Sequence, residues 1–172
     1  MVPVDKRTPA SGGVVLRTLH WGPHHGGELP AFVLVHGLAS NARLWDGVAA
    51  HLATAGHRVI SVDLRGHGIS DKPDDGYDFT TVTDDLLALI AHEGLERPVV
   101  CGQSWGGNVV VELAWRAPDL LRGVCAVDGG VIELGTHFPS WEECADRLKP
   151  PPLAGMRAAR MEGFIRQAHP TW

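Results

Sequence analysis

Residues 99–107 of this chain read VVCGQSWGG. This stretch begins as an apolar run, which predicts a buried strand, and it ends in a serine bracketed by glycines. In a G-x-S-x-G turn the strand and the following helix pass within contact distance, so the residues two before and two after the serine must be small. Gly102 and Gly106 occupy those two positions. The stretch therefore predicts a sharp strand-turn-helix with Ser104 at its apex.

This turn has the form of a nucleophile elbow. Such a turn holds its serine in a strained backbone conformation and lifts the hydroxyl above the sheet. The amide of the next residue, Trp105, would then face the oxyanion that forms when Ser104 attacks a carbonyl. Because a match of five residues also arises by chance, the interpretation depends on the rest of the chain.

The composition excludes several classes of protein. A chain of 172 residues with 44% hydrophobic and 20% charged residues is long and apolar enough to bury a core as a single domain. Its net charge of -5 provides no basic surface for nucleic acid, so a small molecule is the expected partner. The sequence shows neither a signal peptide nor an apolar run that could span a membrane, and we expect a cytoplasmic protein.

The cysteines and histidines suggest neither a disulfide scaffold nor a metal site. Cys101 and Cys125 lie in apolar runs, where cysteine usually acts as a small buried hydrophobe. A metal is most easily imagined at His20, His24 and His25, but the last two lie on a Gly/Pro-rich turn with no cysteine or carboxylate at ligand spacing. We therefore expect a solvated loop there, and neither a metal nor an organic cofactor.

Strand and helix patterns alternate along most of the chain. The strand patterns cover residues 14–21, 31–35, 58–64, 98–101 and 123–128, and the helix patterns cover 41–55, 80–94 and 108–116. We expect 14–21 to be an antiparallel edge strand and 123–128 to be a buried strand, with Thr80 as the cap of its helix. The alternation predicts an α/β fold, a mostly parallel sheet with helices on both faces.

The strand patterns stop after Val131. A capping box at residues 140–143 predicts a helix to Lys149, and a second amphipathic pattern covers 153–168. We expect residues 1–132 to form a core and residues 133–172 to begin a helical lid. Packing of these helices on the back of the sheet is the alternative.

At this point the chain resembles the alpha/beta-hydrolase family. The resemblance covers roughly residues 14–131 and rests on three motifs in the family's order: His36-Gly37, DLRGHGIS at 63–70, and Gly102 to Gly106. It implies the family's fold, here incomplete, and hydrolase activity without a cofactor.

The resemblance also implies roles for single residues. Ser104 matches the nucleophile, and the amides of Leu38 and Trp105 match the oxyanion hole. His36 and His67 match residues that support the surrounding loops, since the catalytic histidine of this fold follows the serine in the chain. Gly37, Gly102 and Gly106 match supporting positions.

Two aspartates and one missing histidine limit this assignment. Asp63 is expected to hold its turn through backbone hydrogen bonds. Asp128 matches the acid of some branches of the family, with a loop-capping role as the alternative and the commoner acid position one strand later. After Ser104 only His137 and His169 remain, and neither follows a strand pattern. We therefore expect the first two-thirds of a hydrolase, with little activity alone and an exposed sheet edge open to self-association.

The leading functional hypothesis is a serine hydrolase that cleaves an ester, amide, lactone or carbon-carbon bond next to a carbonyl through an acyl-enzyme. Epoxide and haloalkane hydrolases of the family normally use an aspartate nucleophile, so Ser104 disfavours both. A non-catalytic small-molecule-binding protein on the same scaffold, and a fragment without a function of its own, are the alternatives.

Overall fold

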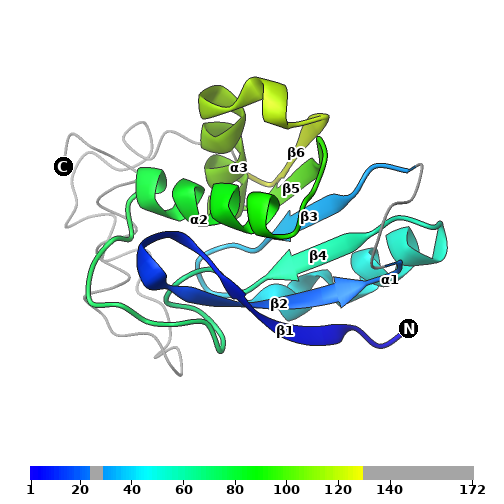
Figure 1. Cartoon of the computed structure of the whole chain (residues 1–172), viewed down its shortest axis with the longest axis horizontal. Coiled ribbons are helices and arrows are strands. Elements are labelled where there is room, and N and C mark those ends of the chain that lie inside the picture. The colour runs from blue at the N-terminus through cyan, green and yellow to red at the C-terminus, as the bar shows by residue number, and fades with distance from the viewer. Residues whose placement is uncertain (24–28, 130–172) are drawn as a thin grey trace.

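The computed structural model describes residues 1–23 and 29–129, which form a single mixed sheet with helices on both faces (Figure 1). The strands are β1 (Val4–Pro9), β2 (Val15–Trp21), β3 (Phe32–Val35), β4 (Val59–Val62), β5 (Val99–Gln103) and β6 (Gly123–Val127). The α-helices are α1 (Asp46–Thr54), α2 (Phe79–His92) and α3 (Trp105–Arg116), and three short 3-10 helices are η1 (Ser11–Gly13), η2 (Ala42–Trp45) and η3 (Pro118–Leu120).

The strands lie in the order β1-β2-β4-β3-β5-β6. Strand β3 runs parallel to both β4 and β5, and β5 runs parallel to β6, whereas β2 is antiparallel to β1 and β4. The predicted α/β fold class is confirmed. The carboxyl ends of the parallel strands meet at one edge of the sheet, where open α/β folds place their ligand sites.

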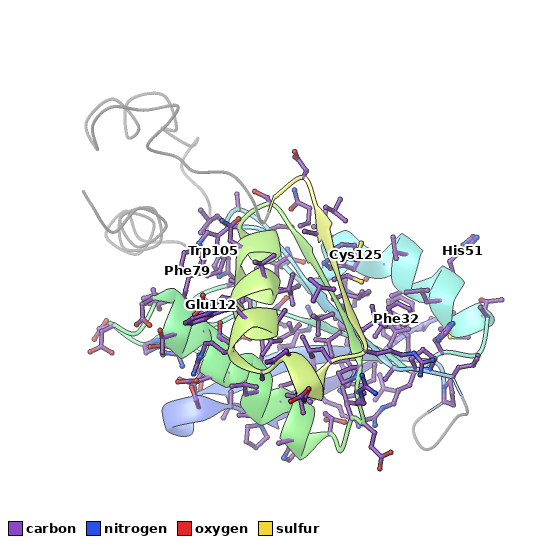
Figure 2. All side chains as sticks on the ribbon, turned by 90° about the horizontal axis from the view of Figure 1, so that it is seen from above. Phe32, His51, Phe79, Trp105, Glu112 and Cys125 are labelled. Carbon is purple, nitrogen blue, oxygen red and sulfur yellow. The ribbon has the colours of Figure 1, made fainter. Side chains whose placement is uncertain are left out.

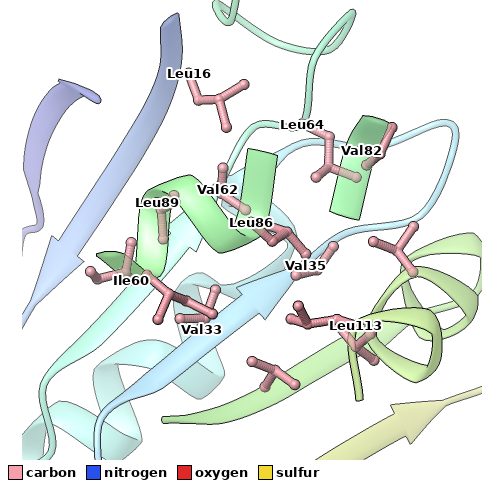
Figure 3. Packing of buried hydrophobic residues seen from close by; sticks show 14 of the residues in the cluster. Leu16, Val33, Val35, Ile60, Val62, Leu64, Val82, Leu86, Leu89 and Leu113 are labelled. Carbon is pink, nitrogen blue, oxygen red and sulfur yellow. The ribbon is translucent and has the colours of Figure 1, made fainter. Parts of the chain in front are cut away.

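Two apolar layers cover the sheet, because successive residues of a strand point to opposite faces. On one face, Val33 and Val35 of β3 and Ile60 and Val62 of β4 pack with α2 and α3, in the cluster that Figure 3 shows. On the other face, Leu34 and Cys101 belong to a smaller cluster with α1. The two layers fix β3, β4 and β5 as the central strands of the core.

Three features differ from the sequence prediction. The strand at residues 14–21 is antiparallel as expected, but it is not an edge strand, because β1 pairs with its outer side. Helix α2 is capped by Asp78 and not by Thr80, since the Asp78 carboxylate accepts a hydrogen bond of 2.8 Å from the amide of Thr81. Helix α3 also begins three residues earlier than the 108–116 pattern, directly after Ser104.

Strand β6 is the outermost strand at its end of the sheet within the described residues. The prediction of a buried strand is wrong for this part of the chain: Val124 and Val127 are 39% and 42% exposed, and Cys125 is exposed. Within residues 1–23 and 29–129, β6 pairs with β5 alone, so its other side has no strand partner in that part of the chain. Self-association through that edge stays a prediction.

Several predictions fall on residues outside the described ones. These are the lid helices at 140–149 and 153–168, the boundary at 132/133, His137, His169 and the His24-His25 pair. Among the helices of residues 1–23 and 29–129, none is long and apolar enough to cross a lipid bilayer.

Candidate active site

Ser104 lies at the apex of a sharp turn between β5 and α3. Its backbone has φ 52° and ψ −124°, a conformation that residues with a side chain rarely adopt. Two hydrogen bonds hold this strained residue: its amide donates to the carbonyl of Val127 at 2.9 Å, and its own carbonyl accepts from the amide of Gly107 at 2.8 Å. The predicted strand-turn-helix is therefore present, with Ser104 half-buried at the surface.

The glycines around Ser104 allow backbone segments to touch. A Cβ atom on Gly102 would lie 2.1 Å from the carbonyl oxygen of Gly106, and one on Gly106 would lie 2.4 Å from that of His36. Both distances are too short for any side chain. Because neither glycine has a side chain, the amino end of α3 can lie directly against the carboxyl end of β3.

The loop after β3 passes directly beside Ser104. A Cβ atom on Gly37 would lie 3.0 Å from the Cβ of Ser104 and 2.8 Å from Oε1 of Gln103. The next residue, Leu38, has its carbonyl oxygen 2.6 Å from Nε2 of His67. The structure thus joins all three predicted motifs at one place, the carboxyl edge of the parallel strands.

His36 is fully buried beneath this loop and is held as a neutral imidazole. Its Nε2 accepts a hydrogen bond from the amide of Leu64 at 3.1 Å, so Nδ1 carries the proton and donates to the carbonyl of Gly37 at 2.6 Å. Burial, followed by the charge of His67, lowers the pKa of His36 to about 3. Its two nitrogens join the loop after β3 to the loop after β4.

His67 makes the second connection between the same two loops. Its Nδ1 lies 3.0 Å from the carbonyl oxygen of Arg65, and Nε2 contacts the carbonyl of Leu38. Burial lowers the pKa of His67, although the two carbonyls and Asp63 oppose the shift. The rings of His36 and His67 meet edge to face with centroids 4.8 Å apart. Each histidine therefore contacts the backbone of both the loop after β3 and the loop after β4.

Asp63 follows β4 and is fully buried. One carboxylate oxygen accepts from the amide of Ala42 at 2.7 Å and the other from the amide of Ile69 at 3.0 Å. The predicted role in holding the turn through backbone hydrogen bonds is confirmed. Asp63 also lies 3.5 Å from the guanidinium of Arg17.

A buried ion pair that the sequence analysis missed ties α2 to the loop after β4. The guanidinium of Arg65 donates two hydrogen bonds to the Asp85 carboxylate, at 2.5 and 2.7 Å. Ser11 adds hydrogen bonds from its amide and hydroxyl to the same carboxylate. The signal was available, because Asp85 shares one helix face with Val82 and Leu89, which predicts a buried carboxylate that needs a partner.

Trp105 is buried at the amino end of α3, next to Ser104. Its ring stacks on Phe79 of α2 with centroids 5.5 Å apart and an interplanar angle of 18°, and Figure 2 shows the two side chains together. Stacking fixes the first turn of α3 to the first turn of α2. The amide of Trp105 lies where the helix dipole favours negative charge.

Asp128 directly follows β6 and is exposed, with φ 51°. The residues on either side of it contact the backbone of Ser104. The carbonyl of Val127 accepts from the Ser104 amide, and a Cβ atom on Gly129 would lie 2.1 Å from the Ser104 carbonyl oxygen. The segment that carries Asp128 therefore lies against the serine turn.

The other described histidines lie far from the carboxyl ends of the parallel strands. His20, His57 and His92 lie near the amino ends of β4 and β5, and His51 lies on the exposed side of α1. No group of three or more histidine, cysteine or acidic residues in this part of the chain is arranged to hold a metal ion.

Comparison with known proteins identifies the family. The model of the alpha/beta hydrolase fold matches residues 30–170. The chain belongs to the alpha/beta hydrolase family.

Three relatives show the range of similar proteins. The chain is 35% identical over 102 residues to 2-(acetamidomethylene)succinate hydrolase from Mesorhizobium japonicum, covering 59% of this chain and 36% of that enzyme. Epoxide hydrolase A from Mycobacterium thermoresistibile has a TM-score of 0.66 at 32% identity, with 72% of this chain and 38% of that chain covered. An alpha/beta hydrolase from Novosphingobium aromaticivorans has the same TM-score, 0.66, at 31% identity, with 73% and 44% covered.

The matched part is a minor share of most of these proteins. Among curated relatives it spans between 31% and 41% of their length.

Proposed function

We propose that Ser104 is the nucleophile of a serine hydrolase that acts on a carbonyl-containing small molecule. The observation that carries this proposal is the strained conformation of Ser104 at a turn where the 36–38 loop passes alongside. Strain at such a turn is retained where surrounding contacts force it, and such sites are commonly functional.

The proposed oxyanion hole consists of the amides of Trp105 and Leu38. Attack of Ser104 Oγ on a carbonyl carbon gives a tetrahedral intermediate with a negatively charged oxygen, which two amides would bind. Each such donor contributes about 3 to 4 kcal/mol to transition-state stabilisation. The His36 contact with the Gly37 carbonyl supports this role, because that carbonyl and the Leu38 amide belong to the same peptide group.

The intermediate then collapses to an acyl-serine, and the leaving alcohol or amine takes the proton that Ser104 lost. Water attacks the acyl group in the second half of the reaction and releases the acid. Both halves need a histidine to carry the proton. Asp128 is the proposed partner of that histidine, which its place beside the Ser104 turn supports.

Neither His36 nor His67 fits the role of the base. His36 uses one nitrogen as donor and the other as acceptor to backbone groups, and both nitrogens of His67 face backbone carbonyls. A serine enzyme without its base loses a factor on the order of 10^4 to 10^6 in rate. We therefore propose that the 172-residue chain has little esterase activity by itself.

The relatives suggest two kinds of scissile bond. One relative is named for a substrate with an acetamido group, which is an amide, and another relative is named an epoxide hydrolase. An oxyanion hole suits the tetrahedral intermediate of an ester or amide, whereas opening an epoxide forms none at carbon. A serine nucleophile with two amides therefore favours the carbonyl substrate.

The test is a single-turnover experiment in which the chain is in excess over the ester p-nitrophenyl acetate and the release of p-nitrophenolate is followed. A parallel reaction with the epoxide styrene oxide is assayed for diol. We expect slow release of p-nitrophenolate that Ser104→Ala abolishes and Ser40→Ala, in the neighbouring loop, leaves unchanged. No diol should form from styrene oxide. Release that is equal in Ser104→Ala, or diol formation, would contradict the proposal, and fast steady-state turnover would contradict the claim of low activity.

A further inference from the structure

Two cysteines face each other across the outer pair of parallel strands. Cys101 of β5 and Cys125 of β6 are direct register partners, so their side chains lie on the same face of the sheet. That face is the one α1 covers, since Cys101 belongs to the α1 cluster. Neighbouring strands lie about 4.7 to 4.9 Å apart, within the roughly 4.4 to 6.8 Å that Cα atoms span in a disulfide.

The two thiols differ in their access to solvent. Cys101 is only 8% exposed, whereas Cys125 is exposed, and Figure 2 shows it on β6. Burial, and then the neighbouring Cys125, raise the pKa of Cys101 to about 12. An attacking oxidant therefore meets Cys125 first, with Cys101 held beside it as a protonated thiol.

We propose that Cys101 and Cys125 form a site of reversible oxidation, a cross-strand dithiol that a peroxide converts into a disulfide. The Cys125 thiolate attacks one peroxide oxygen, the O–O bond breaks, and the sulfur becomes a sulfenic acid. The hydroxide that leaves takes up the proton that the Cys125 thiol had lost and becomes water. The sulfur of Cys101 then attacks that sulfur, the S–O bond breaks, and the Cys101 proton leaves with the hydroxyl as a second water. Two thiols are oxidised and one peroxide is reduced.

The bond would join the two strands that lead to the candidate site. Strand β5 ends immediately before Ser104, and β6 ends at Val127, whose carbonyl accepts the hydrogen bond of the Ser104 amide. A disulfide at Cys101 and Cys125 would therefore fasten these strands a few residues before that hydrogen bond. The proposal does not depend on the activity of Ser104.

The test uses the full chain with Cys144→Ser, which removes the third cysteine of the sequence. Titration with hydrogen peroxide should cause both thiols to disappear together, with a mass decrease of about 2 Da and recovery by dithiothreitol. Proteolysis of the oxidised chain should give one linked peptide pair that contains Cys101 and Cys125. Adding Cys101→Ser should abolish the link and leave Cys125 open to a glutathione adduct.

Three outcomes would overturn the proposal. One is a monomer whose mass increases by one or more oxygen atoms while Cys101 still reacts with maleimide after unfolding. Another is a covalent dimer through Cys125. The third is a chain whose two thiols both survive an excess of peroxide. The disulfide is detected directly in the chain that carries only Cys144→Ser. The conclusion therefore does not depend on whether the Cys101→Ser variant folds.

Discussion

Gly106 shows how closely the elements around Ser104 approach one another. A Cβ atom there would lie 2.4 Å from the His36 carbonyl oxygen and 2.7 Å from that of Val35, and both are backbone atoms that cannot move aside cheaply. Gly106→Ala should therefore lower the free energy of unfolding by about 1 to 3 kcal/mol or more. Urea denaturation followed by circular dichroism measures the change.

Gly47 in α1 is the matched control, because a Cβ atom there meets nothing within 4 Å. Gly47→Ala should be neutral or stabilise the chain by up to about 1 kcal/mol, as expected for alanine in a helix. Equal effects of the two substitutions would show that the close contact at Gly106 is not present in the protein.

His36 makes stability depend on pH. Burial lowers the pKa of His36 from its ordinary 6.5 to about 3, so between these values the folded chain keeps it neutral while the unfolded chain binds a proton. Its contribution is complete above pH 6.5 and is lost as the pH falls toward 3. Between neutral pH and about pH 5 this loss should reach about 2 kcal/mol.

The measurement compares urea denaturation of the wild type and His36→Gln at several pH values. The variant should be less stable at neutral pH and should lose less stability on acidification. His51→Gln, at an exposed position on α1, is the control and should keep the wild-type pH dependence. Parallel curves for wild type and His36→Gln would contradict a neutral, buried His36.

At the residue scale, motif positions were predictable from the sequence and buried polar partners were not. The glycines beside Ser104 and the turn-holding Asp63 could be assigned because their roles are local to a short segment. The helix face of Asp85 indicates that it is buried, but its partners could not be predicted, since Arg65 and Ser11 lie 20 and 74 residues away in the chain.

At the element scale, this ion pair holds α2 to the loop after β4. Both groups are nearly inaccessible, with side chains 5% and 0% exposed. Asp85→Ala would leave the Arg65 charge buried without its carboxylate. It should lower the free energy of unfolding by about 3 to 5 kcal/mol, measured by urea denaturation.

The adjacent Asp84 is the control on the same helix. It pairs with Arg116 of α3 at 2.6 Å, but the two side chains are 42% and 25% exposed. Asp84→Ala should cost no more than about 1 kcal/mol, because solvent screens the pair. A loss for Asp85→Ala as small as that for Asp84→Ala would mean that the Arg65 pair does not hold α2.

Strand β1 shows why one element escaped prediction. Its sequence VDKRTP has no alternating apolar pattern, and only Thr8 is buried. It forms because the backbone of β2 offers hydrogen bonds along its outer side, which sequence periodicity cannot report. The central strands β3, β4 and β5 are continuous apolar runs buried on both faces, so their positions were predictable.

At the scale of the whole molecule, the topology brings distant motifs together. The residues after β3, β4, β5 and β6 all lie at the carboxyl edge of the parallel strands, which places His36, His67, Ser104 and Asp128 in one region. The alternation of strands and helices predicted this α/β arrangement, and the three motifs predicted the family. It could not predict that Cys125 would be exposed, because burial of β6 depends on what lies beyond it in the sheet.

Ser104 is proposed as a nucleophile whose base is not one of the histidines within residues 1–23 and 29–129. The direct measurement is labelling of the full chain with a fluorophosphonate, with and without added imidazole, scored by intact mass and peptide mapping. Serine oxygen attacks phosphorus, fluoride leaves, and imidazole accepts the proton. We predict slow labelling of Ser104 that imidazole accelerates and that Ser104→Ala abolishes. Labelling that is equal in Ser104→Ala, or none at any imidazole concentration, would contradict the account.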